Sequence, residues 1–137
     1  MKAKGFTLDT NIVTALIKKD EGILARIRKA REEDLHVTMN AITYYEIKRG
    51  LESIKKSEKI KEFGSISHDL GILFIDEKDI LNYANTLWAN LKQRGLLIED
   101  ADILIASIAS IKGYTLVSDD TDFERVPELV VENWLRQ

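Results

Sequence analysis

Short apolar runs alternate along this chain with longer segments that are apolar on one face. The runs hold three to five residues and predict buried strands, whereas the longer segments have the spacing of helices. The expected strands are Phe6–Leu8, His36–Met39, Gly71–Ile75 and Tyr114–Ser118, with an edge strand within residues 128–135. The expected helices cover residues 11–19, 22–33, 41–53, 55–63, 77–95 and 99–113. This alternation predicts an α/β fold around a mostly parallel sheet.

Length and composition narrow the class of protein further. At 137 residues with one Pro and no low-complexity tract, the chain is expected to form a single domain over residues 1–137. The absence of Cys excludes disulfides, Cys-based zinc sites and thiol nucleophiles. No apolar run approaches the roughly 20 residues of a membrane span, and the N-terminal "MKAKGF" lacks the apolar segment of a leader. A cytoplasmic protein without membrane contact is therefore expected.

Acidic residues follow the expected strands at one edge of the sheet. In open α/β sheets, ligands bind outside the carboxyl ends of parallel strands. Asp9 directly follows the first strand, and Asp119, Asp120 and Asp122 follow "YTLVS". The pair Asp100 and Asp102 begins the helix that runs back from the same edge, and Glu46 lies about two turns into the helix after "HVTM". We expect these acids to share one rim.

Each acid alone also has a structural explanation. Asp9 can be a helix cap, and Asp100 and Asp102 favour a helix N-terminus through its dipole. "SDDTDF" is typical of a turn closed by Asp side chains, and Glu46 can pair with a surface base. Their convergence favours a site, because crowded carboxylates take up a proton unless a cation neutralises them. Oxygen ligands without Cys or His favour Mg²⁺ or Mn²⁺ over Zn²⁺.

Four stretches of this sequence resemble the PIN-domain ribonucleases, and more narrowly the VapC-type toxins. They are "LDTNIV" from Leu8, "YYEIKRGL" from Tyr44, "DADILIASIA" from Asp100 and "LVSDDTDFERVP" from Leu116. The resemblance covers nearly the whole chain. It implies a three-layer α/β/α sandwich with a mostly parallel central sheet and an acidic pocket that binds Mg²⁺ or Mn²⁺. It also implies endonucleolytic cleavage of RNA.

The same resemblance implies the roles of single residues. Asp9 and Asp102 are expected to hold the main ion, with Glu46 and Asp119 holding a second ion or orienting the attacking water. Asp122 is kept beside Asp119 as an alternative fourth acid. Asp100 is a weaker candidate than its neighbour. Thr10 and Asn11 are expected to position the first acid, and the two histidines, His36 and His68, have no assigned role.

The expected reaction is metal-assisted hydrolysis of an RNA phosphodiester. Basic side chains must bring the phosphates to an acidic pocket, and two groups are candidates. The first is Lys48, Arg49, Lys55, Lys56, Lys59 and Lys61, and the second is Arg26, Arg28, Lys29 and Arg31. Such runs are also common on solvated helix faces.

The resemblance further implies a VapB-like antitoxin that blocks the pocket, and a homodimer. Tyr44, Tyr45 and Ile47 are candidates to face a partner, with a place in the core as the alternative. Two other functions stay open at this point. One is a phosphatase of the haloacid-dehalogenase type, although Asn11 stands where that family has a second Asp. The other is a module that binds RNA or peptide without catalysis.

Overall fold

A five-stranded parallel sheet forms the centre of the protein, in the order β3-β2-β1-β4-β5. The computed structural model describes residues 3–136, so the ends of the expected domain lie outside the described residues. The strands are β1 (Gly5–Leu8), β2 (His36–Asn40), β3 (Ile72–Leu73), β4 (Thr115–Val117) and β5 (Val131–Glu132). All four strand pairs are parallel. The predicted α/β fold and its parallel sheet are confirmed.

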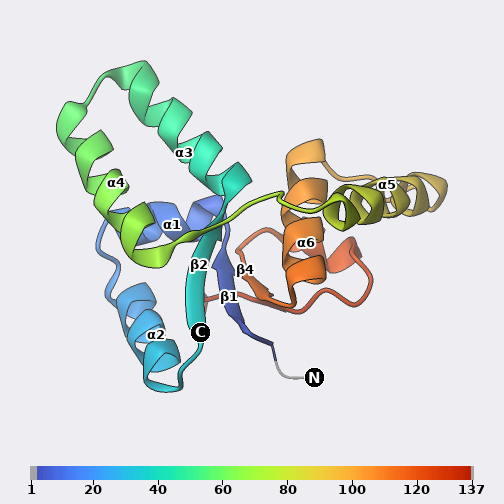
Figure 1. The fold of residues 1–137 in the computed structure, drawn as a ribbon, viewed down its shortest axis with the longest axis horizontal. Helices are drawn as coiled ribbons and strands as arrows, with labels where there is room; N and C mark the ends of the chain where they lie inside the picture. The colour runs from blue at the N-terminus through green and yellow to red at the C-terminus, as the bar shows by residue number, and fades with distance from the viewer. Residues whose placement is uncertain (1–2, 137) are drawn as a thin grey trace.

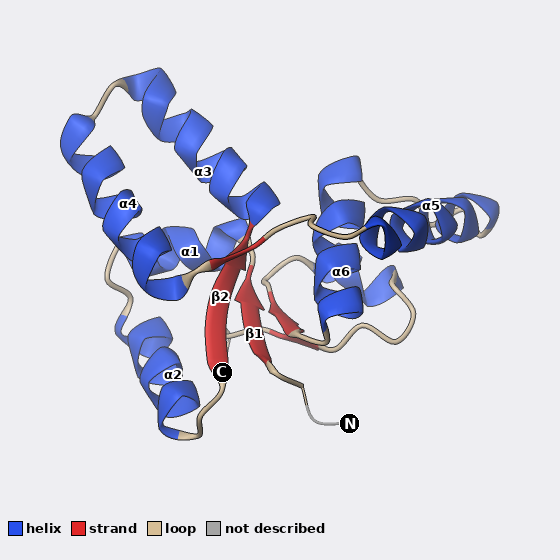
Figure 2. Ribbon diagram, viewed as in Figure 1, coloured by secondary structure: helices blue, strands red, loops and turns tan. Residues whose placement is uncertain are grey.

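Helices cover both faces of this sheet, which gives the three layers of an α/β/α sandwich (Figure 1). The helices are α1 (Thr10–Ile17), α2 (Glu21–Glu32), α3 (Ala41–Ile54), α4 (Ser57–Leu70), α5 (Lys78–Gln93) and α6 (Asp100–Lys112). Figure 2 shows α1 to α4 on one side of the strands and α5 with α6 on the other. A short 3-10 helix, Thr121–Arg125, follows β4.

Two hydrophobic clusters fill the space between the layers. Successive residues of a strand point to opposite faces, so Val117 joins the cluster under α1 and α2 while Leu116 joins the cluster under α5 and α6. The helix α6 is apolar on nearly every side and lies deep in the second cluster, with Ile105 and Ile108 fully buried. This burial holds α6 firmly against the sheet.

Three differences from the expected elements have physical causes. The helix α4 ends at Leu70 and not at Phe63, because Phe63, Ser67 and Leu70 share its buried face and continue past Gly64. Burying such a face outweighs the roughly 1 kcal/mol that Gly costs in a helix. The strands β3 and β5 hold two residues each, since both are edge strands that pair on one side only.

The topology brings the carboxyl ends of β1, β2 and β4 together in the middle of the sheet. The strand β1 lies between β2 and β4, with Leu8 beside Met39 on one side and Val117 on the other. The helices α1 and α3 start immediately after β1 and β2. None of the described helices is long and apolar enough to cross a membrane.

Candidate metal centre

Asp9 lies at the base of the candidate site, at the junction of β1 and α1. Its side chain is 6% exposed, and both of its oxygens accept a hydrogen bond. The Thr10 N–H donates to Oδ1 at 2.8 Å, and the Ser118 hydroxyl donates to Oδ2 at 2.7 Å. Asp9 therefore caps α1 and is also fixed from β4. Burial raises the pKa of this carboxyl, helped by Glu46, while the two hydrogen bonds oppose the rise.

Glu46 approaches the same place from α3. The Thr10 hydroxyl donates to Glu46 Oε1 at 2.8 Å, so one residue orients two acids: its N–H holds Asp9 and its hydroxyl holds Glu46. The cap of α3 explains why this helix starts where it does, because the Asn40 side chain accepts from the Thr43 N–H at 2.9 Å. That start places Glu46 near the rim.

Asp102 completes the group from the first turn of α6. Burial raises its pKa to about 7, and the carboxylates of Asp120, Asp9, Glu99 and Glu46 add to the rise in that order. Each of these negative charges disfavours a further one nearby. The ionised form of Asp102 is thus unfavourable here unless a positive charge lies nearby.

Asp120 and Asp122 meet Asp102 from the loop after β4. One carboxylate oxygen from each of the three residues lies within 4.8 Å of the others. The Asp120 Oδ1 accepts from the Asp122 N–H at 2.9 Å, which is the Asp-closed turn that the sequence indicated. The Asp120 N–H in turn donates to the Ser118 hydroxyl at 3.0 Å. The same two residues, Asp120 and Asp122, therefore form both the turn and part of the acid cluster.

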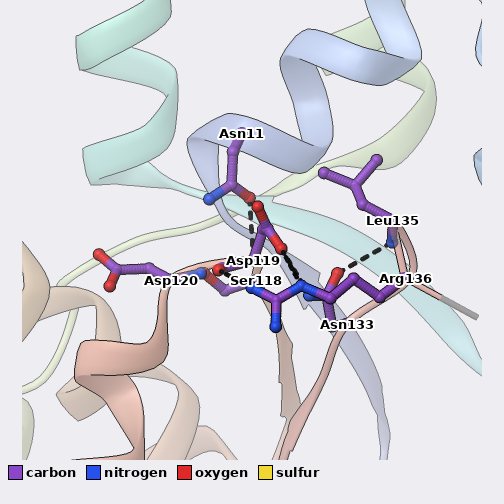
Figure 3. A network of polar contacts seen from close by, with 7 residues as sticks. All are labelled: Asn11, Ser118, Asp119, Asp120, Asn133, Leu135 and Arg136. Carbon is purple, nitrogen blue, oxygen red and sulfur yellow. Dashed lines mark hydrogen bonds and ion pairs between the residues drawn. The ribbon is translucent and has the colours of Figure 1, made fainter.

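Asp119 lies apart from this cluster, although it neighbours Asp120 in the chain. Its Oδ1 accepts from Asn133 Nδ2 at 2.6 Å and from Arg136 Nε at 3.1 Å, both in the C-terminal segment. The Asp119 N–H donates to Asn11 Oδ1 at 3.3 Å. Figure 3 shows the Asp119 side chain among these partners and the Asp120 side chain directed away from them. The expected role of Asp119 at the ion stays a prediction.

Other residues named from the sequence have clear positions. Asp100 is exposed at the start of α6, whereas Asp102 is half-buried. Among the candidates for partner contact, Tyr44 stacks on Phe63 with ring centroids 5.5 Å apart and Ile47 is buried. Only Tyr45 is strongly exposed, at 58%.

The two basic groups lie at different places relative to the acids. The lysines of the first group, Lys55 to Lys61, surround the turn between α3 and α4, and α3 also carries Glu46. The second group lies on α2, which leads into the opposite, amino end of β2 (Figure 1). His36 is at that amino end too, and its Nδ1 lies 3.1 Å from the Tyr114 hydroxyl. Position alone favours the first group for contact with a substrate held at the acids.

Sequence reasoning missed two residues of the site. The sequence places Asp120 in the acidic stretch without indicating a role, and it places Ser118 at the end of a strand. Ser118 is 2% exposed and joins Asp9 to Asp120 through its hydroxyl. The available signal was its place: a Ser that directly follows a buried strand and precedes two acids at a ligand-binding rim.

The arrangement suits a hard divalent cation. All its side-chain donors are carboxylate oxygens, the ligand type that Mg²⁺ and Mn²⁺ prefer. Burial, with neighbouring carboxylates adding to it, raises the pKa values of Asp9 and Asp102, and a bound cation would offset both effects by favouring the charged form. Within the described residues, Asp102 and Asp120 form no ion pair with a base, while Arg125 reaches Asp122 at 3.6 Å.

Comparison with known proteins places the chain in a family. The PIN domain family matches residues 6–129. The chain is 35% identical over 136 residues to ribonuclease VapC2 of Haemophilus influenzae, covering 95% of this chain and 98% of that protein. It is 28% identical over 137 residues to ribonuclease VapC2 of Rickettsia felis, covering 94% and 97%. This chain belongs to the PIN domain family.

Solved structures agree with this assignment. The crystal structure of VapBC2 from Rickettsia felis, bound to a DNA fragment from its promoter, contains a chain with a TM-score of 0.87 and 27% identity. That match covers 94% of this chain and 98% of the other. DNA-bound VapBC from Salmonella typhimurium gives a TM-score of 0.86 at 26% identity, covering 98% and 99%. The relatives thus include ribonucleases and chains of two-component complexes.

Proposed function

We propose that this protein is a metal-dependent endoribonuclease and the toxin of a type II toxin–antitoxin pair. The convergence of Asp102, Asp120 and Asp122 carries the proposal, because three carboxylates from two distant elements lie within 4.8 Å. Asp9 and Glu46 border the same place. The PIN family match and the ribonuclease relatives support RNA as the substrate. We propose the cytoplasm as the place where the protein meets this RNA.

The residues that would hold Mg²⁺ or Mn²⁺ are Asp102, Asp120 and Asp122, with Asp9 and Glu46 beside them. A bound divalent ion supplies an acidified water and offsets the charge that develops on phosphorus. The chain's own residues prepare for this. Ser118 and Thr10 hold the two oxygens of Asp9 in a fixed direction, and Thr10 holds Glu46. Fixed ligands lose little freedom when the ion binds.

Substrate binding needs positive charge near this acidic centre. Lys48 and Arg49 follow Glu46 within one turn of α3, and the α3–α4 turn at the far end of this helix adds the exposed Lys55, Lys56 and Lys59 (Figure 1). We propose that these bases bind phosphates along an RNA strand that leads to the acids. Cleavage is then expected to weaken steeply as salt rises, because binding the phosphates releases counterions.

Incubation with RNA tests the activity directly. The purified protein, freed of any partner, is mixed with tRNA and rRNA pools in the presence of Mg²⁺, with and without EDTA. We expect cleavage that EDTA stops and that Asp9→Asn reduces by at least about 100-fold, since it removes a charge from the ion site. Intact RNA in every pool would contradict the nuclease. A phosphate bound covalently to Asp9 would instead support the phosphatase alternative.

We propose a VapB-like antitoxin as the partner and a homodimer as the assembly. Solved relatives include VapBC complexes, and Tyr45 on α3 is an exposed aromatic side chain available for contact with a partner. Co-expression with the product of an adjoining small open reading frame is expected to yield a complex that no longer cleaves RNA. Light scattering gives the mass of the free protein. An adjoining product that neither binds nor inhibits would contradict the toxin role while leaving the nuclease intact.

A further inference from the structure

Asp119 and Asp120 leave the end of β4 in opposite directions. The strand β4 ends at Val117 and the chain bends at Asp119, so the two neighbouring side chains reach different surroundings. Asp120 meets Asp102 and Asp122, while Asp119 meets the C-terminal segment. The identity of the residue that enters the acid cluster therefore depends on how this segment is turned. A rotation that brought Asp119 inward would take Asp120 out.

The C-terminal segment is a firm support for this loop. It pairs with β4 through the Ser118 N–H, which donates to the Glu132 carbonyl at 2.9 Å. Trp134 is 6% exposed and packs edge-on against Phe6, with ring centroids 5.0 Å apart. Asn133 is fixed in turn, since its Oδ1 accepts from the Leu135 N–H at 2.9 Å. The side chains on either side of Trp134 are thus held against the sheet.

Asn133 and Arg136 of the C-terminal segment both contact the Asp119 side chain. Asn133 Nδ2 and Arg136 Nε both donate to Asp119 Oδ1, at 2.6 and 3.1 Å, and Arg136 Nη2 lies 3.5 Å from the Asp119 carbonyl oxygen (Figure 3). A charge-assisted hydrogen bond of this kind is stronger than a neutral one. Asn11 accepts from the Asp119 N–H on the other side. Asp119 is therefore held from two elements and by both its backbone and its side chain.

We propose that Asp119, Asn133 and Arg136 form a C-terminal clasp that aims the Asp120 carboxylate into the metal centre. These three are positioning residues, and they act on the ion through Asp120. The inference rests on the proposed function, because it requires an ion at the acid cluster. It assigns to Asp119 a role different from that of a ligand.

The sign of one change separates this clasp from a simple charge effect. Arg136 is a positive charge beside a cation site, so its removal should strengthen cation binding if charge alone matters. Its removal also frees Asp119 to become a ligand, which acts in the same direction. The clasp predicts the opposite: Arg136→Ala weakens binding, because Asp120 loses its fixed direction.

The experiment is a titration of the metal-free, full-length protein with Mn²⁺, with free Mn²⁺ measured by electron paramagnetic resonance. We expect Arg136→Ala to weaken affinity by about 10-fold, as is typical for a residue that orients a ligand. Arg136→Lys is expected to recover part of the loss. The matched control is Arg31→Ala, which removes another exposed Arg–Asp pair: Arg31 on α2 lies 3.0 Å from Asp69 on α4. It should leave affinity unchanged.

The outcomes distinguish failure of the clasp from failure of the metal site. Asp120→Asn serves as the reference and should weaken Mn²⁺ binding by more than Arg136→Ala does. If Asp120→Asn has no effect, the metal site itself is wrong. If Asp120→Asn weakens binding but Arg136→Ala leaves it unchanged or strengthens it, the clasp is wrong. Circular dichroism must show that the variants keep the native fold, and Arg136 is 65% exposed at its side chain, so folding is expected.

Asp119→Asn gives an independent second test. The amide keeps an oxygen that can accept from Asn133 but loses the charge that holds Arg136. The clasp predicts that Asp119→Asn and Arg136→Ala each weaken Mn²⁺ binding and that the double variant is no weaker than the worse single one, since both break one unit. Losses that multiply in the double variant would contradict the clasp.

Discussion

Each end of α6 lies beside an acid, but the electrostatic surroundings of the two acids are opposite. At the amino end, Asp102 lies among other carboxylates, and burial with these neighbours raises its pKa to about 7. At the carboxyl end, Lys112 Nζ lies 2.7 Å from Asp76 Oδ1, and this hydrogen bond lowers the pKa of Asp76. At the carboxyl end, the negative charge of an acid is neutralised by a basic side chain, as is usual in folded proteins. The amino end leaves charge uncompensated, which is the mark of a binding site.

The largest expected effect comes from neutralising one acid at each end. Asp102→Asn should reduce RNA cleavage by at least about 100-fold, because it removes a ligand-type oxygen charge from the metal centre. Asp76→Asn makes the same chemical change at the other end and should leave cleavage unaltered. Initial rates on a single RNA substrate at saturating Mg²⁺ provide the measurement. Equal losses in both variants would contradict the division of α6 into a site end and a structural end.

The next effect is the dependence of ion binding on pH. Asp102 must lose its proton to bind a cation, and its pKa is about 7. Mn²⁺ affinity should therefore fall about tenfold for each pH unit below 7 and level off above it. Calorimetric titration between pH 5.5 and 8.5 measures the slope, and Asp102→Asn should flatten it. A flat profile for the unaltered protein would show that Asp102 is not part of the ion site.

A smaller effect concerns the stability of the metal-free protein. Asp102 has a higher pKa when folded than when unfolded, so the folded state holds its proton more tightly. Its contribution to stability is therefore present below about pH 4 and is lost as pH rises toward 7. Asp102→Asn should stabilise the protein by about 1 kcal/mol at pH 8, after allowance for solvent screening, and hardly at all at pH 4. Urea unfolding in EDTA at both values checks this, and an equal effect at both would contradict it.

The smallest effect is expected at the carboxyl end of α6. The pair of Lys112 with exposed Asp76 is a surface salt bridge, and such pairs contribute little to stability. Lys112→Ala should shift the melting temperature by less than about 3 °C and leave Mn²⁺ affinity unchanged. Because the pKa of Asp76 is lowered, any contribution is present at neutral pH and is lost under acid conditions. A change in Mn²⁺ affinity would contradict the assignment of a purely structural role to the carboxyl end of α6.

The central strands and part of the acidic site could be predicted from the sequence, whereas the pairing of Lys112 with Asp76 could not. Hydrophobic periodicity located the central strands, and the rule for parallel sheets brought Asp9, Glu46 and Asp102 to one rim. Edge strands were less predictable: the apolar run from Gly71 to Ile75 contains only a two-residue strand, and Phe74 is 55% exposed. An edge strand forms hydrogen bonds with one neighbour only, so fewer of its residues are held in the sheet. The apolar run in the sequence is therefore longer than the strand.

The sequence leaves the fourth acid open between Asp119 and Asp122, and it does not single out Asp120. Both acids lie beyond the end of β4, where the chain bends and no strand or helix periodicity predicts the direction of a side chain. In the structure, Asp119 contacts Asn133 and Arg136, which are 14 and 17 residues away in the chain, while Asp120 lies beside Asp102. No local pattern encodes such a contact. Ser118 escaped notice for a related reason, because its hydroxyl works across 109 positions to reach Asp9.

The central claim is that the crowded acids at the amino end of α6 bind a divalent ion. Crystals of the protein soaked in millimolar Mn²⁺ at pH 8 test it most directly through anomalous scattering. We predict a peak bounded by Asp102, Asp120 and Asp122, with carboxylate oxygens about 2.1 Å from the ion. The absence of a peak there, with Asp120 still beside Asp102, would contradict the account.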